Sequence, residues 1–192
     1  EKVLQHLCAN DVAVPQGRIV YTQMLNRRGG IEADVTVTRL SETEFLVITP
    51  AATIRRDLGW IERHIPEQAH CIAIDMTVSE AVIAVMGPMA RDILQPLTAQ
   101  SLDNADFKFG QAKEVEIGHA FARAHRVSYV GELGWELYVS TEMAEHVFDV
   151  VMEAGAEKGL MPAGMHVLDS CRIEKAFRHF GHDISDEDHI LE

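Results

Sequence analysis

The feature that most constrains the fold is a set of three short extended segments joined by polar turns near the start of the chain. The segments are residues 18–25, 31–40 and 45–49. In the second of them Val35 and Val37 alternate with polar neighbours, the period of two that is typical of a half-buried strand. The connection at residues 26–30 reads Asn-Arg-Arg-Gly-Gly, a composition typical of turns. These observations predict an antiparallel meander.

Helices and further strands follow the meander. Apolar residues at helical spacing predict helices at residues 2–9, 53–65, 89–97, 141–158 and 165–176. Extended patterns predict strands at residues 70–76, 81–86, 115–117, 120–129 and 135–139. Thr53 is a candidate N-cap for its helix. No glycine-rich strand-to-helix turn is present, so we predict an α+β fold of antiparallel sheets with flanking helices rather than a doubly wound nucleotide fold.

The chain has 192 residues, a length that suits one large domain or two small ones. The stretch at 96–106 is the best internal boundary, and it divides the chain into residues 1–98 and 99–192. The chain opens without Met inside a predicted helix and ends just after an acidic stretch. We therefore expect it to be a piece of a longer protein.

Composition narrows the function classes. The chain carries 17 Lys and Arg against 30 Asp and Glu, a formal charge of −13, which argues against a nucleic-acid partner. No apolar run approaches the roughly 20 residues of a membrane span. Cys8, Cys71 and Cys171 are far apart and form no CxxC pair, so we expect reduced thiols in a cytosol-like compartment.

The sequence contains none of the common nucleotide-binding and catalytic motifs GxGxxG, GxxxxGK[ST], GxSxG and HExxH. His179, His182 and Asp183 offer metal-ligand chemistry, but a polar loop after a helix explains them better, because no further ligand lies at suitable spacing. The acidic residues at 183–188 lack the glycine and terminal glutamate of a calcium loop. We expect no metal site.

Asp34 lies in the middle of a predicted strand, although aspartate is depleted from strand interiors. It could simply occupy the wet face of the sheet. The preceding Gly29-Gly30 pair, however, lets backbone or ligand approach closely. The residues alone are compatible with both roles.

Tyr129 and Glu136 flank a Gly-Glu-x-Gly turn, at the end of one predicted strand and the start of the next. A carboxylate on a rigid strand beside an aromatic ring could grip a planar heterocycle that carries adjacent N–H and NH₂ groups. It could equally face solvent. Arg172 lies three residues after Asp169 on the last predicted helix, where a surface ion pair is the default interpretation.

The segment from Tyr21 to Asp34 resembles the "Y-T-x-x-x-N-x-x-G-G-I-x-x-D" signature of the folate-binding aminomethyltransferase family, which includes the glycine-cleavage T-protein. Three further landmarks of that family follow in its order. They are Gly87-Pro88, Tyr-Val-Gly-Glu-Leu-Gly-Trp-Glu at residues 129–136, and Asp-Ser-Cys-Arg-Ile-Glu-Lys at residues 169–175. The resemblance runs nearly end to end and implies the family's folate-binding fold, built of two intertwined subdomains.

Within the family the chain is most similar to the folate domains of dimethylglycine and sarcosine dehydrogenases. Residues 172–183 resemble that branch's "R-x-E-K-x-x-R-H-x-G-x-D", and Ala33 stands where the T-protein usually carries an aspartate. Phe180 departs from the tyrosine of the T-protein, so a hydroxyl contact is lost there.

The resemblance also implies roles for individual residues. Asp34 matches the catalytic aspartate beside the N5/N10 edge of tetrahydrofolate, where it orients the amine and manages its proton. Tyr21 and Tyr129 match residues that pack against the ligand's rings. Glu136 matches the carboxylate that grips the pterin, and Arg172 an arginine of the folate site.

The implied reaction is transfer of a one-carbon unit to tetrahydrofolate from an iminium or aminomethyl group derived from an N-methyl amine. FAD and the family's C-terminal barrel would belong to domains outside this chain. Two alternatives remain, a free-standing T-protein-like aminomethyltransferase and a non-catalytic folate-binding module. The expected location is the cytoplasm, or the mitochondrial matrix in a eukaryote.

Overall fold

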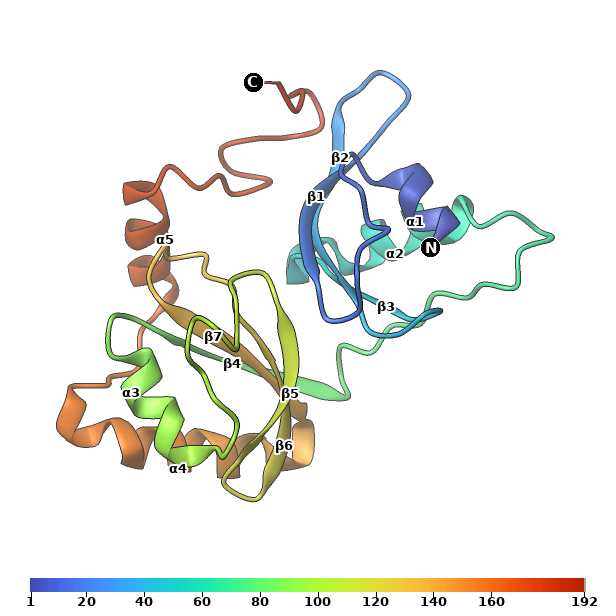
Figure 1. Cartoon of the computed structure of the whole chain (residues 1–192). Coiled ribbons are helices and arrows are strands. Elements are labelled where there is room, and N and C mark those ends of the chain that lie inside the picture. Colours follow the sequence, from blue (N-terminus) through green and yellow to red (C-terminus); the bar gives the residue numbers. More distant parts are fainter. Residues whose placement is uncertain (192) are drawn as a thin grey trace. The chain divides into compact units, whose positions relative to one another are not determined.

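The computed structural model describes residues 1–191 and divides the chain into two compact units (Figure 1). Unit 1 comprises Glu1–Asp75 and the segment that begins at Arg178, and unit 2 comprises Met76–Phe177. Unit 1 is thus built from both ends of the chain, as expected for intertwined subdomains. The predicted division between residues 98 and 99 falls inside unit 2.

Unit 1 contains the predicted meander. Strands β1 (Ile19–Leu25), β2 (Ile31–Arg39) and β3 (Phe45–Ile48) form a three-stranded antiparallel sheet in that order. Helices α1 (Lys2–Leu7) and α2 (Ile54–Arg63) belong to the same unit, and the 3₁₀ turn η1 (Ala51–Thr53) precedes α2. Alternate residues of β1 and β2 enter a core with α1 and α2, formed mainly by Leu4, Leu7, Val12, Met24, Ala33, Val35 and Val37. The period of two therefore separates one apolar face from one polar face.

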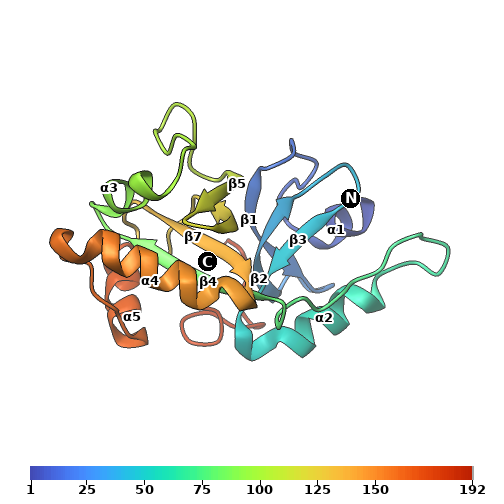
Figure 2. The same cartoon turned by 90° about the horizontal axis from the view of Figure 1, so that it is seen from below.

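Unit 2 contains a four-stranded antiparallel sheet in the order β4-β7-β6-β5. Its strands are β4 (Glu80–Met86), β5 (Ala112–Ile117), β6 (Ala120–His125) and β7 (Gly134–Ser140). One face packs against α3 (Ala90–Leu94) and α4 (Ala144–Gly155), and Figure 2 shows α4 running along that face. The core includes Phe107, Trp135, Leu137, Val139, Val147 and Val151. Helix α5 (Met165–Glu174) completes the unit.

The antiparallel α+β fold is confirmed, but several predicted elements differ in extent. Short 3₁₀ turns bound the helices: η2 (Gln95–Leu97) follows α3, and η3 (Thr141–Met143) and η4 (Ala156–Lys158) flank α4. The Thr53 hydroxyl does not cap α2; it donates to the buried Asp57 carboxylate instead, at 2.6 Å. The cap prediction is wrong because η1, not an extended residue, leads into the helix.

Two strand predictions are wrong. Residues 70–76 form no strand but an extended loop (Figure 1), and Ile72 and Ile74 are exposed, because within residues 1–191 no segment pairs with them in a sheet. The strand predicted to end at Tyr129 ends at His125. Among residues 1–191, no helix has both the length and the apolar character that a membrane span requires.

Candidate functional site

Asp34 lies on the polar face of the three-stranded sheet, where the strand register gives it defined neighbours. Gln23 of β1 stands directly opposite Asp34, and Tyr21 stands opposite Thr36. Because paired residues of antiparallel strands share a face, all four side chains lie on the same side of the sheet. The Gln23 amide donates to Asp34 Oδ1 at 2.8 Å.

The surroundings of Asp34 change its acidity. Burial raises the pKa of its carboxyl above the ordinary value, while hydrogen bonds from Tyr21 and Gln23 lower it less. The Tyr21 residue is 55% exposed, so its ring is open to solvent, while its hydroxyl hydrogen-bonds the Asp34 carboxylate. Tyr21 and Gln23 can therefore hold the Asp34 carboxylate in place beside a ligand, with which Asp34 can exchange a proton.

The turn before β2 explains the Asn-x-x-Gly-Gly part of the signature. The Asn26 side chain accepts the backbone N–H groups of Arg28 and Gly30 at 2.9 and 3.0 Å, which closes the turn. Gly29 has φ +84°, a conformation that favours glycine. A Cβ at Gly30 would lie 2.3 Å from the backbone oxygen of Asp186. Because these two residues are glycines, the backbone of the C-terminal segment of unit 1 can pack closely against the start of β2.

Glu136 lies on the face of the four-stranded sheet opposite to its core. The Tyr138 hydroxyl donates to Glu136 Oε2 at 2.6 Å, and no described residue donates to Oε1. Burial raises the pKa of the Glu136 carboxyl, and the hydrogen bond from Tyr138 lowers it less. Burial also raises the pKa of Tyr138, and the neighbouring carboxylate adds to that effect. The phenol stays a donor, which leaves one carboxylate oxygen available to a ligand.

His125 stands opposite Glu136 in the β6–β7 register. It is fully buried, its ring centroid lies 4.5 Å from that of Tyr138, and its Nε2 has no hydrogen-bond partner in the part of the chain that the structure describes. Burial, followed by the charge of Arg123, lowers its pKa to about 4. His125 is therefore a neutral imidazole beneath the carboxylate near pH 7.

The ion pair expected between Arg172 and Asp169 is present, but Arg172 itself is buried, with 4% of its surface exposed, rather than on the surface. Its Nε donates to Asp169 at 2.7 Å, and its Nη1 donates to the Phe177 carbonyl at 3.0 Å. The Phe177 ring stacks on Tyr129 at 6.4 Å between centroids. Arg172 thus fixes the segment just after α5 that carries Phe177, the ring on which Tyr129 stacks.

A second contact joins the same two regions. The Lys175 side chain passes so close to Gly131 that a Cβ at Gly131 would lie 2.2 Å from Lys175 Cγ. Its ammonium lies 3.7 Å from Glu132. The family landmarks at residues 129–136 and 169–175 are therefore packed together within unit 2.

Two of the C-terminal histidines lie next to each other. His179 and His182 rings lie 4.5 Å apart, and the Asp183 carboxylate accepts the His179 backbone N–H at 2.8 Å. Over residues 1–191, no group of three or more His, Cys, Asp or Glu side chains is placed to hold a metal ion. Phe180 lies under the Arg56 guanidinium, 5.4 Å from ring centroid to Cζ.

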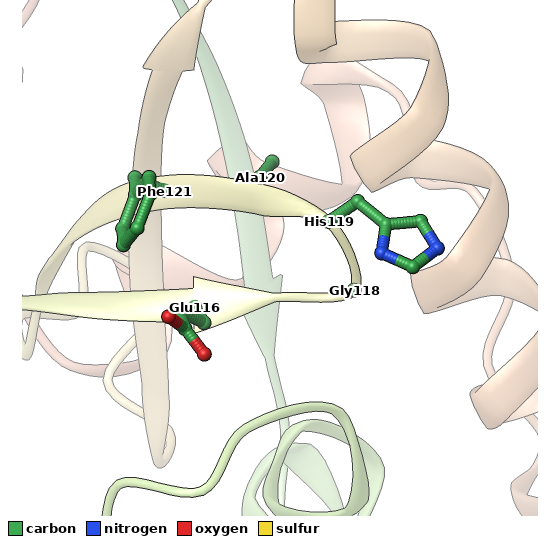
Figure 3. Close-up of a pocket in the computed structure, with 5 residues that line it drawn as sticks. All are labelled: Glu116, Gly118, His119, Ala120 and Phe121. Atoms are coloured by element: carbon green, nitrogen blue, oxygen red, sulfur yellow. The ribbon is translucent and has the colours of Figure 1, made fainter.

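A pocket of about 240 Å³ lies at the β5–β6 turn (Figure 3). Its lining is Glu116, Gly118, His119, Ala120 and Phe121, and it contains none of the five predicted site residues. The His119 backbone N–H donates to Nε2 of His146 at 3.0 Å, and the two rings stack. The imidazole pair fastens the hairpin to α4.

Two of the predicted residues, Tyr21 and Asp34, meet in unit 1, and the other three belong to unit 2. There Tyr129 and Arg172 are joined through Phe177, while Glu136 has Tyr138 and His125 as its neighbours. Sequence reasoning missed Gln23, Tyr138 and His125. Gln23 and Tyr138 lie two residues after a chosen residue on the same strand, a spacing that would have signalled a shared face. His125 needs the strand register.

Comparisons with known proteins identify the family. The family model described as the GCVT N-terminal domain matches residues 1–192. The chain is 42% identical to 4-methylaminobutanoate oxidase (formaldehyde-forming) of Paenarthrobacter nicotinovorans over 95% of its length, and 38% identical to mitochondrial dimethylglycine dehydrogenase of Rattus norvegicus over 100%. It spans 22% of each of these relatives.

A solved structure supports the fold. The glycine cleavage system aminomethyltransferase T from Bartonella henselae superposes with a TM-score of 0.81 at 24% identity. The match covers 98% of this chain and 49% of that chain. By its match to the family model over its whole length and by the fold that it shares with the T-protein, the chain belongs to the aminomethyltransferase family, as a GCVT N-terminal domain.

Proposed function

We propose that this chain is the folate-binding part of an enzyme that transfers a one-carbon unit to tetrahydrofolate, of the dimethylglycine and sarcosine dehydrogenase type. The observation that carries the proposal is a pair of half-buried carboxylates, Asp34 and Glu136, each on the polar face of a sheet and each bonded to a tyrosine hydroxyl. Membership of the family supplies the ligand class, and relatives of the chain include a dehydrogenase of dimethylglycine.

The Glu136 site fits a pterin edge. Only Oε2 of the carboxylate is engaged by Tyr138, so Oε1 can accept an N–H group. The strand β7 fixes the backbone, and the buried Tyr138 fixes the side chain. A charge-assisted hydrogen bond to an N–H is stronger than a neutral one. We assign to Glu136 the task of orienting the heterocycle.

Asp34 suits proton handling. Tetrahydrofolate supplies the N5 and N10 amines that accept the one-carbon unit. The raised pKa brings the carboxyl closer to neutral pH, where a general base works best. Tyr21 presents an exposed ring for packing against the ligand while its hydroxyl holds Asp34. Gln23 keeps the carboxylate oriented.

Tyr129 and Arg172 support the pterin side. The Tyr129 ring stacks on Phe177, whose carbonyl Arg172 holds. We assign Tyr129 to ring packing, and Arg172 to the folate site through the position it gives to this stack. The one-carbon donor, an iminium or aminomethyl group from an N-methyl amine, would come from a flavin-bearing domain outside this chain.

The proposed compartment is the cytoplasm or the mitochondrial matrix. The three cysteines are free thiols, in keeping with a reducing environment.

Calorimetric titration of the 192-residue chain with tetrahydrofolate tests the binding half of the proposal. Glu136→Gln should weaken binding by about tenfold or more, since a hydrogen bond to a charged group contributes roughly 1.5–3 kcal/mol. Glu114→Gln, at an exposed position of β5, is the matched control and should bind like wild type. Equal affinity for the Glu136→Gln variant would refute the assignment.

Asp34→Asn tests the catalytic half in the full-length parent protein. We expect folate binding within a few fold of wild type and a methylene-transfer rate lower by roughly 10²–10⁴, the usual contribution of a positioned acid–base group. Glu62→Gln on the exposed face of α2 is the control. An unchanged transfer rate with Asp34→Asn contradicts the role of Asp34 and leaves the binding assignment of Glu136 standing.

A further inference from the structure

Two arginines of unit 2 share one neutral acceptor. Arg91 on α3 and Arg126 just after β6 both donate to Asn104 Oδ1, at 2.7 and 2.6 Å. Their other printed bonds go to backbone carbonyls, that of Leu102 for Arg91 and that of Phe107 for Arg126. Both guanidinium groups lie against the Trp135 ring, with Cζ 5.7 and 5.6 Å from its centroid.

No carboxylate compensates this pair. Among the described residues, no Asp or Glu oxygen lies within 4 Å of a nitrogen of either guanidinium. The nearby Asp106 is engaged instead by the Ser101 hydroxyl at 2.6 Å. In a chain with 30 acidic residues and a charge of −13, two adjacent uncompensated cations are an unusual arrangement.

The arrangement costs electrostatic free energy unless an anion joins it. Two like charges that share one acceptor repel each other, more strongly where water is partly excluded. The pKa of Arg126 is lowered by burial and by the charge of Arg91, in keeping with that repulsion. Each planar guanidinium uses only part of its five N–H donors here, and the donors that remain suit oxygen pairs of carboxylate or phosphate.

We propose that Arg91, Arg126 and Asn104 form a binding site for a small oxyanion, a phosphate or carboxylate group, separate from the residues assigned to folate. The anion would bridge the two guanidinium groups beside Asn104. If the two arginines only held the 102–107 loop in place, their hydrogen bonds to its backbone carbonyls would be enough and no anion would be needed. The two accounts therefore differ in whether an anion stabilises the protein.

Trp135 provides a direct reporter. The chain has two tryptophans, and Trp60→Phe leaves Trp135 as the only one. In this variant, inorganic phosphate titrated against chloride at constant ionic strength should change the Trp135 fluorescence and raise Tm in a saturable manner. Acetate in a parallel titration distinguishes carboxylate from phosphate as the preferred oxyanion.

Asn104→Asp is the decisive variant because it places a carboxylate where both guanidinium groups already donate. We expect Tm to rise without phosphate, and the saturable response to disappear. Ala105→Glu adds the same charge at the next exposed residue and should keep the response. Arg126→Lys retains the charge but loses the planar donor pair, and should weaken phosphate binding by about tenfold or more.

Phosphate also stabilises proteins without binding a site, by exclusion from their surface, and that effect does not saturate. A response that fails to saturate in the Trp60→Phe chain overturns the proposal. So does a saturable response that Asn104→Asp leaves unchanged.

Discussion

The three-stranded sheet of unit 1 and the four-stranded sheet of unit 2 each carry a carboxylate on the face away from the core, but they support it differently. Asp34 is held by Tyr21 and Gln23, both on the neighbouring strand, and Tyr21 is mostly exposed. Glu136 is held by Tyr138 of its own strand, which is 5% exposed. A support buried within one strand gives a fixed carboxylate, which suits gripping a ligand. A support that is open to solvent suits a group that exchanges protons.

The largest predicted effect is on the free energy of unfolding, and it comes from His125. This buried imidazole lies beside Glu136 of unit 2, and Asp34 of unit 1 has no such neighbour among the described residues. The folded-state pKa of His125, about 4, lies below the ordinary 6.5, so the folded state binds fewer protons than the unfolded state between these values. The resulting stability is complete above pH 6.5 and is lost as the pH falls toward 4. The loss is on the order of 3 kcal/mol.

His125→Phe should remove most of this pH dependence, as measured by urea unfolding between pH 4 and 7. His6→Gln, at an exposed position of α1, should retain it. Trp135 fluorescence follows unit 2 and Trp60 fluorescence follows unit 1 in chains with a single tryptophan. A destabilisation at pH 5 that starts in unit 1 would show that the comparison misplaces the pH-sensitive group.

The close backbone approach at Gly30 in unit 1 gives the next effect. Gly30→Ala would place a Cβ against the Asp186 carbonyl, so the C-terminal segment or the turn must move. We expect a loss of about 1–3 kcal/mol, the usual cost of overpacking, in the free energy of unfolding.

Gly164→Ala is the matched control, because a Cβ there meets nothing within 4 Å. Amide hydrogen exchange should show faster exchange of Ile31, whose N–H donates to the Asp188 carbonyl at 3.1 Å. Unchanged protection at Ile31 in the Gly30→Ala chain would contradict the contact.

The smallest predicted effect tests the carboxylates themselves. Because burial raises the pKa of both, ionisation of Asp34 and Glu136 costs stability, and that cost is present once the pH rises through the folded-state pKa. Asp34→Asn and Glu136→Gln should therefore each stabilise the chain at pH 7, by about 0.5–2 kcal/mol. Thermal unfolding measures this; destabilisation by either change would show that the charge is needed for folding rather than held for a ligand.

Much of the fold follows from local pattern. The alternation of Val35 and Val37 located β2, and the polar turns located its neighbours. Local pattern failed at residues 70–76, where Ile72 and Ile74 flank Ala73 in a segment predicted to be extended, but no second strand among the described residues pairs with them. Periodicity reports what a segment could do, whereas a sheet needs a partner that only the three-dimensional arrangement supplies.

The site divides in the same way. Asp34 and Glu136 are singled out by a resemblance of motifs, and in the structure both lie half-buried on strands. The burial of Arg172 and the position of His125 beside Glu136 depend on packing between elements far apart in the chain. No spacing in the sequence contains that information.

The link between the first hairpin and the end of the chain has a consequence for synthesis on the ribosome. Ile31 and Gly30 pair with Asp188 and His189, so the turn before β2 obtains these partners only after all of unit 2 has been translated. Unit 2 is contiguous from Met76 to Phe177 and has all its residues earlier. Since domains fold as their residues emerge, the unit that begins first should be completed last. The contacts of unit 1 join residues that are far apart in the sequence, which also predicts slower folding of unit 1.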